Sequence, residues 1–99
     1  MTIKKIKEEL KVSDHPVVKS LHHGAAFKVL ILGFRKGMIL KEHKARVQSK
    51  LTVLEGAVIF KEENKAVELK QYDEVEIPTE IMHSVEAMED SLCILSQGE

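Results

Sequence analysis

Two histidines, His43 and His83, are the residues of this chain whose type best suits chemistry. Imidazole binds transition metals and titrates near neutral pH, so such a pair could hold a divalent metal or act as a general base. Two imidazoles alone make a weak metal site, because structural zinc usually has four protein ligands and catalytic zinc three. Chemistry at this pair therefore needs either further ligands or no metal at all.

The other reactive side chains have simpler interpretations. Cys93 is the only cysteine, so the chain can form no internal disulfide, and we expect a small apolar core residue rather than an activated nucleophile. We expect His22 and His23, which precede Gly24, to be solvent-exposed turn residues. The charged segment 61–65 is predicted to be a solvated hairpin tip. No residue is assigned a catalytic role from the sequence.

Regular turn signals predict many short strands. Clusters of turn-forming residues separate short stretches rich in Val, Ile, Leu and Phe along the whole chain. Apolar and polar residues alternate in 66–70 and 74–77, which is typical of strands with one buried face. The segments 29–32 and 58–60 are apolar on both faces, as expected for strands with neighbours on both sides. This spacing favours a sandwich or a barrel.

A helix is expected only near the N-terminus. Ile3, Ile6 and Leu10 have helical spacing, so a helix over residues 4–10 is one interpretation, and a short edge strand with a turn is the other.

Length and composition predict a single soluble domain spanning residues 1–99. The chain is 43% hydrophobic and 31% charged, with a formal net charge of −1, no tryptophan and no basic patch, so we expect no nucleic-acid partner. The apolar runs are too short to span a bilayer, the first ten residues lack the apolar region of a secretory signal, and we expect a cytoplasmic protein without a membrane partner.

Two segments carry a resemblance to a known superfamily. Residues 37–56 read GMILKEHKARVQSKLTVLEG, and residues 72–87 read YDEVEIPTEIMHSVEA. Together they resemble the two motifs of the cupin superfamily. The first motif has the form G, five residues, H, one residue, H, three or four residues, E, six residues, G. The second has the form G, five residues, P, one residue, G, two residues, H, three residues, N.

The first motif is only partly kept. Gly37 and His43 match its opening glycine and first histidine, and Gly56 matches its closing glycine. Ala45 stands in place of the second histidine, and Ser49 stands in place of the glutamate.

The second motif is also partly kept. Pro78 and His83 match the family pattern. Tyr72 and Glu80 replace its two glycines, and Ala87 replaces its asparagine.

The resemblance implies an all-β fold, the double-stranded β-helix or jelly-roll barrel of the RmlC-like cupins. An immunoglobulin-like sandwich is the structural alternative, but the chain has neither the cysteine pair nor the tryptophan typical of that fold. A homodimer is also implied, and we expect exposed apolar faces of 29–32 or 51–54 to supply its interface.

The resemblance further implies a metal held by three histidines and a glutamate, of which only His43 and His83 remain. We expect these two to be the metal ligands, holding a divalent transition metal at low affinity if any is bound. Substitute ligands considered from the sequence are Glu42, Gln48, Glu80, His22, His23 and Cys93.

Two functions follow. In the first, the protein binds a small molecule in its barrel with weak or no metal binding, and His43, Ala45, Ser49, Met82 and His83 line the ligand site. In the second, it is an enzyme: a metal-dependent oxygenase or isomerase with a rebuilt metal site, or a metal-free catalyst like the cupin-type epimerases, with His43 or His83 as general base. The sequence names neither the ligand nor the substrate.

Overall fold

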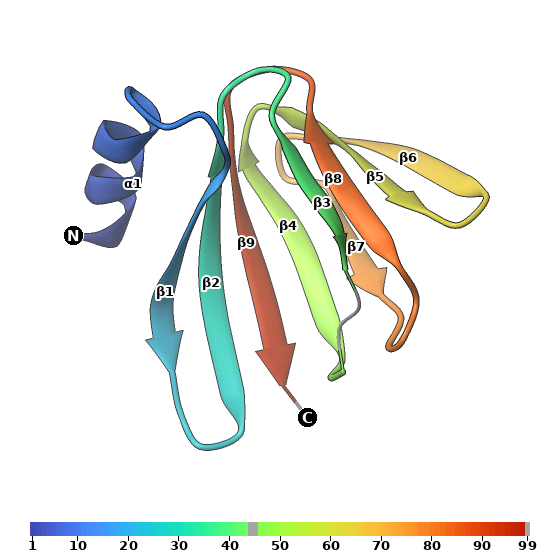
Figure 1. The fold of residues 1–99 in the computed structure, drawn as a ribbon. Helices are drawn as coiled ribbons and strands as arrows, with labels where there is room; N and C mark the ends of the chain where they lie inside the picture. Colours follow the sequence, from blue (N-terminus) through green and yellow to red (C-terminus); the bar gives the residue numbers. More distant parts are fainter. Residues whose placement is uncertain (44–45, 99) are drawn as a thin grey trace.

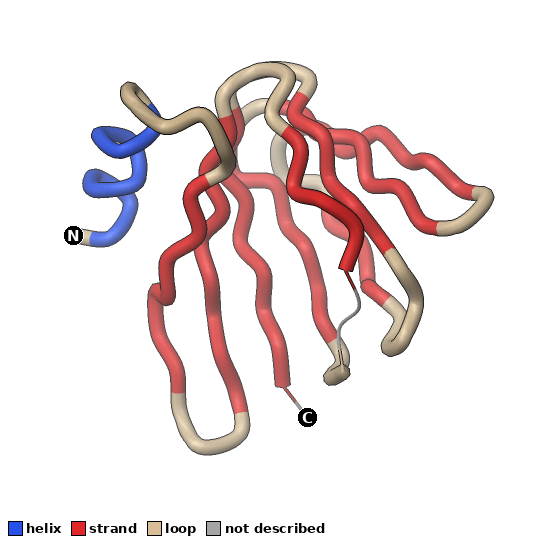
Figure 2. The backbone as a smooth tube through the Cα atoms, viewed as in Figure 1, coloured by secondary structure: helices blue, strands red, loops and turns tan. Residues whose placement is uncertain are grey.

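The computed structural model describes residues 1–43 and 46–98, with only the backbone described at positions 42 and 43. This part of the chain forms an N-terminal helix followed by a succession of strands (Figures 1 and 2). The elements are α1 (Thr2–Leu10), β1 (Val17–His23), β2 (Phe27–Phe34), β3 (Ile39–His43), β4 (Ser49–Glu55), β5 (Ala57–Glu62), β6 (Lys65–Lys70), β7 (Glu74–Ile77), β8 (His83–Ala87) and β9 (Ser91–Gly98).

The strands form two antiparallel sheets that face each other (Figure 1). One sheet has the order β1-β2-β9-β4-β7, and the other has the order β3-β8-β5-β6. Their hydrogen-bonded ladders do not join into one closed barrel within the described residues. The prediction of an all-β jelly-roll fold is confirmed, because strands distant in sequence, such as β2 and β9, are direct neighbours in the sheets.

The core lies between the sheets and follows from the alternation of apolar residues. Inward-facing side chains of both sheets pack together, while their neighbours along each strand face outward. The core side chains are Leu32, Phe34, Leu51, Val53, Val58, Phe60, Leu69, Ile77, Val85, Ala87, Cys93 and Leu95.

Helix α1 covers part of the outer face of the five-stranded sheet. Ile6 and Leu10 pack against Val17, Ile31 and Leu92, so the apolar stripe of the helix buries the outward residues of β1, β2 and β9. Of the two interpretations of the N-terminus, the helix is therefore confirmed. The Arg35 guanidinium donates hydrogen bonds to the carbonyl oxygens of Leu10 and Ser13, and the first of these satisfies a carbonyl group that the helix end leaves unpaired.

The predicted dimer faces are wrong in their details. The outward face of 29–32 includes Ile31, which α1 covers completely, and Leu54 packs against the same cluster. Leu51 and Val53 point into the core. Ile31, Leu51 and Val53 are therefore buried within the chain, and Leu54 is half-buried, so these side chains are not the exposed apolar faces that were expected.

Gly33 allows the close approach of the helix. A Cβ atom at this position would lie less than 3.0 Å from side-chain atoms of Ile6 and Leu10. We expect Gly33→Ala to lower the free energy of unfolding by about 2 kcal/mol, the usual cost of overpacking. Denaturant unfolding measures this, and the cost should shrink in an Ile6→Ala background, where the methyl group has room. An equal cost in both backgrounds would contradict this explanation.

No helix in the described part of the chain is long and apolar enough to cross a membrane.

Candidate functional site

His83 is a buried histidine whose ring orientation is fixed by the backbone. It begins β8, it is 2% exposed, and its ring lies 5.6 Å from that of Phe60 between centroids. Its Nδ1 lies 3.2 Å from the carbonyl oxygen of Ile81. Because a carbonyl oxygen only accepts hydrogen bonds, Nδ1 is the donor in this contact.

The register of the four-stranded sheet places His43 opposite His83. His43 ends β3 and pairs with His83 across the ladder, after an irregularity that follows Leu40. The predicted proximity of the two residues therefore holds at the level of the backbone. The side chain of His43 and all of Ala45 lie outside the described residues.

Ser49 is buried, and its hydroxyl is already hydrogen-bonded. It begins β4 on the inner face, is 6% exposed, donates to the Val47 carbonyl oxygen at 3.1 Å and accepts from Gln97 Nε2 at 3.2 Å. These bonds make Ser49 part of a polar row with Gln97 rather than a metal ligand.

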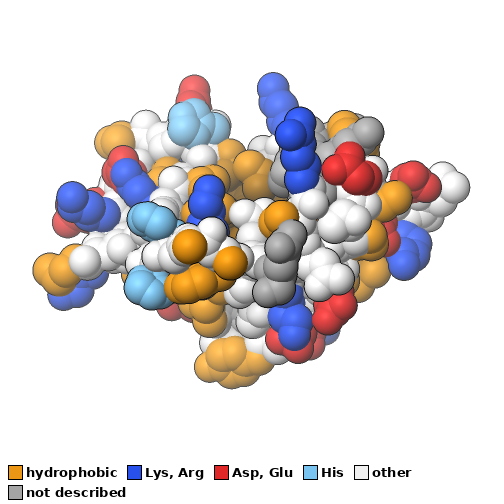
Figure 3. Space-filling model, turned by 90° about the horizontal axis from the view of Figure 1, so that it is seen from below, with side chains coloured by type: hydrophobic (Ala, Val, Ile, Leu, Met, Phe, Trp, Pro, Cys, Tyr) orange, Lys and Arg blue, Asp and Glu red, His pale blue; other side chains and the backbone are white. Residues whose placement is uncertain are grey.

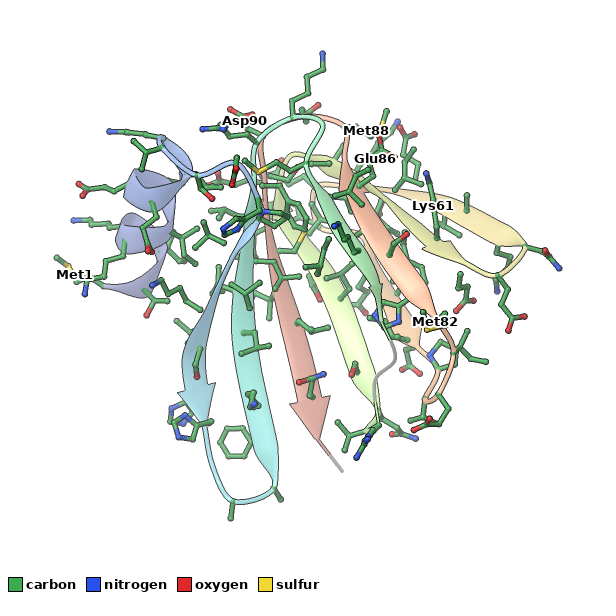
Figure 4. The ribbon with its side chains drawn as sticks, in the orientation of Figure 1. Met1, Lys61, Met82, Glu86, Met88 and Asp90 are labelled. Atoms are coloured by element: carbon green, nitrogen blue, oxygen red, sulfur yellow. The ribbon has the colours of Figure 1, made fainter. Side chains whose placement is uncertain are left out.

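Met82 lies at the rim of the sandwich rather than inside it. The residue precedes β8 and is 39% exposed. Figure 4 shows Met82 at the end of β8 from which the strand begins, close to the turn that follows β7.

The sequence analysis missed Glu62, the carboxylate beside His83. Val58, Phe60 and Glu62 alternate along β5, and the first two are buried in the core, so Glu62 also faces inward. It pairs directly with His83 in the ladder between β5 and β8.

The Glu62 side chain is only 13% exposed. Its Oε1 lies 3.3 Å from Lys65 Nζ. Its Oε2 is buried and has no hydrogen-bond partner among the described residues. The prediction of a fully solvated hairpin tip at 61–65 is therefore wrong for this residue. The period-two pattern from Val58 could have revealed it.

Two cavities meet at the open end of the sandwich. One, of about 560 Å³, lies between β1, β2, β9 and β3 and is lined mainly by apolar side chains. Another, of about 740 Å³, extends over the rim formed by β2, β4, β7 and β9 and includes residues from both faces of that sheet. Gln97 lines both cavities. In Figure 3, which views the molecule from below, hydrophobic and histidine side chains gather on this face.

The backbone keeps the glycine geometry of both motifs even where glycine is absent. Gly37 and Gly56 have φ values of +88° and +86°, and Tyr72 and Glu80 have φ values of +73° and +62°. All four positions at which the motif pattern has glycine therefore lie in the left-handed region that favours glycine. The resemblance thus extends to the backbone at the two substituted positions.

Glycine at position 80 should relieve backbone strain. We expect Glu80→Gly to raise the free energy of unfolding by about 0.5 kcal/mol, because the relief of the left-handed conformation exceeds the entropic cost of glycine. Thr79→Gly is the matched control: Thr79 is an exposed turn neighbour without positive φ, and we expect a small loss of stability there. Denaturant midpoints compare the two variants, and equal losses would contradict this assignment of strain.

Among the remaining candidates, the side chain of Glu42 lies outside the described residues, and the others are exposed or unreactive. Glu80 and Gln48 are exposed. His22 and His23 are exposed as predicted, but they are the last residues of β1 after a bulge, so their assignment to a turn is wrong. Cys93 is fully buried as predicted, and burial raises the pKa of its thiol from 9.0 to about 12, which keeps the thiol protonated and unreactive.

The described residues fit the four-ligand cupin metal site poorly. They contain no group of three or more His, Cys, Asp or Glu side chains placed to hold a metal ion. The position of the family's glutamate is occupied by Ser49, whose hydroxyl is engaged elsewhere. The donors described at this end of the sheet are His83 and Glu62.

The fold matches solved structures closely. A cupin superfamily protein from Desulfitobacterium hafniense superimposes with a TM-score of 0.81 at 12% identity, over 87% of this chain and 79% of that chain. The chain has the cupin fold. KdgF from Halomonas sp. matches with a TM-score of 0.77 at 24% identity, over 89% of this chain and 84% of that one. A cupin 2 conserved barrel domain protein from Leptotrichia buccalis matches with a TM-score of 0.80 at 26% identity, over 94% of this chain but 46% of that one.

Comparison of the sequence alone adds no further similarity to these structural matches. No family model matches the sequence, and no curated protein matches it. At these identities the comparison shows the fold alone, so function has to be argued from the site itself.

Proposed function

We propose that this cupin-fold protein binds a small organic molecule between its two sheets. The observation that carries the proposal is the apolar cavity of about 560 Å³, which has the size and lining typical of small-molecule sites. Its walls are formed by Val18, Leu30, Leu32, Ile39, Leu40 and Leu95, and its polar side chains are His15, Lys41 and Gln97.

Strand register explains how the lining of this cavity changes from apolar to polar toward the open end of the sandwich. Leu30, Leu95 and Leu51 stand opposite one another across β2, β9 and β4, and they form an apolar row. The next inward row toward the open end contains Gln97 and Ser49, which are hydrogen-bonded to each other. A ligand with an apolar body and a polar end would fit this gradient, with its polar end at the rim.

A thermal-shift screen of small organic molecules with mixed apolar and polar character tests the proposal. Val18→Phe narrows the cavity from the edge strand β1, while Leu21→Phe places a phenyl ring on the same strand outside the cavity lining. We expect compounds that stabilise the natural protein to lose their effect in Val18→Phe and to keep it in Leu21→Phe. The proposal fails if no compound stabilises the protein, or if the stabilisation survives unchanged in Val18→Phe.

The second candidate function is an enzyme, and the orientation of His83 favours it. The bond from Nδ1 to the Ile81 carbonyl oxygen holds the imidazole in one orientation, as is typical of histidines that act as general bases or metal ligands. The chemistry would be that of a metal-dependent oxygenase or isomerase, or of a metal-free epimerase-like catalyst. Unchanged turnover of a candidate substrate by His83→Ala would exclude this role.

The sequence prediction that His43, Ala45, Ser49, Met82 and His83 contact the ligand remains a separate proposal, because the described lining of the 560 Å³ cavity is made by other residues. We also propose that the protein is a homodimer, that it is cytoplasmic, and that it has no nucleic-acid partner. Sedimentation equilibrium of the full chain measures the oligomeric state directly, and a monomer at all concentrations would exclude the dimer.

A further inference from the structure

We propose that the molecule bound between the two sheets carries a carboxylate at its polar end, and that Lys28 and Gln97 recognise this group. The inference rests on the binding function proposed above and names its ligand class, a small carboxylic acid with an apolar body. It follows from the position of Lys28 on the inner face of the five-stranded sheet.

Strand register places Lys28 on the inner face of β2. Alternate residues of a strand share a face, and Leu30 and Leu32, which follow on β2, pack in the core between the sheets. Lys28 pairs directly with Gln97 of β9, and Gln97 pairs with Ser49 of β4. One inward row therefore contains a lysine, an amide and a hydroxyl. Figure 1 shows the ends of β2, β9 and β4 side by side at this end of the sandwich, where the C-terminus lies.

The charge on this part of the inner face is positive. Lys28 and Gln97 line the cavity of about 740 Å³. Lys50 and Glu76 also line it, but they pair with each other on the outer face, because Glu76 alternates with the inward-facing Ile77. The described lining of the apolar cavity of about 560 Å³ contains no acidic side chain. A negatively charged group at this end therefore meets attraction from the inner face of this sheet.

The acidic side chain on the inner face of the opposite sheet belongs to another cleft. Glu62 lines a cleft of about 340 Å³ and is paired with Lys65 at 3.3 Å. It is not part of the lining of either cavity that Gln97 borders. Glu62 therefore does not oppose a carboxylate held beside Gln97.

Lys28 and Gln97 both have donors to offer. Lys28 is exposed and has no ion-pair partner among the described residues, whereas Lys50 on the same rim is paired with Glu74 at 3.6 Å. The Gln97 amide donates one N–H to Ser49 Oγ at 3.2 Å, and its second N–H is left to donate. Directly opposed residues of an antiparallel pair have Cβ atoms about 5 Å apart, so both side chains can reach the two oxygens of one carboxylate.

The spacing of the rows describes the rest of the ligand. Leu30 and Leu95 form the next inward row and line the apolar cavity. Neighbouring inward rows are two residues apart, which is about 7 Å along a strand. The apolar body of the ligand must therefore begin within a few carbon atoms of its carboxylate.

Calorimetric titration of the full chain with octanoate and octanamide tests the proposal, because these probes have the same shape and differ in charge. We expect octanoate to bind roughly tenfold more tightly than octanamide, since a hydrogen bond to a charged group is stronger than a neutral one. Octylamine, which carries the opposite charge, should bind less tightly than octanamide.

Lys28→Gln and Lys50→Gln form the matched pair of variants. Both remove one positive charge from the same rim, the first from the inner face and the second from the outer face. Lys28→Gln should remove most of the preference for octanoate and leave octanamide binding within about twofold, while Lys50→Gln should leave both affinities within about twofold. Because Lys28 is exposed, Lys28→Gln should fold normally, and its melting temperature checks this.

Equal affinity for octanoate and octanamide in the natural protein would overturn the proposal. An octanoate affinity that Lys28→Gln leaves unchanged, or that Lys50→Gln lowers equally, would overturn it as well. The binding function would survive these results if octanamide binding is lost in Val18→Phe, because that variant reports on the apolar cavity. Absence of octanoate binding at millimolar concentration also overturns the carboxylate assignment, whereas the binding function fails only on the thermal-shift screen.

Discussion

Gly56→Ala is expected to lower the free energy of unfolding by about 4 kcal/mol, because two separate costs add at this position. The first is a left-handed backbone, with φ of +86°. The second is steric: a Cβ atom here would lie less than 3.0 Å from the Asp90 carbonyl oxygen and from Ser91. Such a loss is a large part of the free energy of unfolding of an ordinary domain, which is about 5–15 kcal/mol.

The surroundings of Gly56 have little freedom to move. Gly56 joins β4 of one sheet to β5 of the other. Ser91 is 4% exposed, and its hydroxyl accepts from the Ala57 backbone N–H at 3.1 Å and donates to the Glu89 carbonyl oxygen at 2.7 Å. The backbone at Asp90 and Ser91, which would meet the added methyl group, is therefore held in place by the hydrogen bonds of the Ser91 hydroxyl.

Gly37→Ala provides the matched comparison. Its φ of +88° is nearly the same, but a Cβ atom there would meet no atom within 4 Å. We expect only the backbone cost, about 1 kcal/mol. Denaturant unfolding of both variants measures the difference, and equal losses would show that the contact with Asp90 and Ser91 carries no weight.

These glycines also explain why the fold could be predicted from the sequence. The residues from Gly37 to Gly56 and from Tyr72 to His83 keep the spacing of turns. A turn depends on the backbone conformation of a few neighbouring residues, so a sequence motif can indicate it. Alternation in 74–77 gave the faces of β7 for the same reason, since the period of a strand is local, whereas in β6 only Leu69 is buried and Val67 is exposed. Tyr72 and Glu80 replace the glycines of the motif pattern, yet both residues have positive φ.

The candidate site was harder to predict, because it depends on contacts between distant strands. Glu62 lies in a charged segment that is typical of an exposed hairpin, and only its pairing with β8 shows that it lies beside His83. Likewise, the bond between Ser49 and Gln97 joins residues 48 positions apart. Helix α1 buries the outer faces that the sequence suggested for a dimer, which no local pattern could show.

Phe60→Ala is expected to lower the free energy of unfolding by about 4 kcal/mol, the usual cost of removing a buried aromatic ring. Phe60 is 2% exposed and belongs to the core between the sheets. Phe27→Ala is the control: it removes the same ring from a side chain that is 45% exposed, so we expect a loss below about 1 kcal/mol. Denaturant unfolding compares them, and a similar loss in both would contradict the assignment of the core.

Phe60→Leu separates the packing role of the ring from its effect on the site. Leucine keeps most of the apolar volume, so we expect a loss of about 1 kcal/mol and a folded protein. The His83 ring, however, loses the aromatic neighbour that lies 5.6 Å away on one side, while its bond to Ile81 remains. The imidazole should therefore keep its tautomer but gain rotational freedom, which ¹⁵N NMR of the ring nitrogens would detect. An unchanged spectrum would mean that the Phe60 ring does not help to position His83, and that the core and the site are energetically separate.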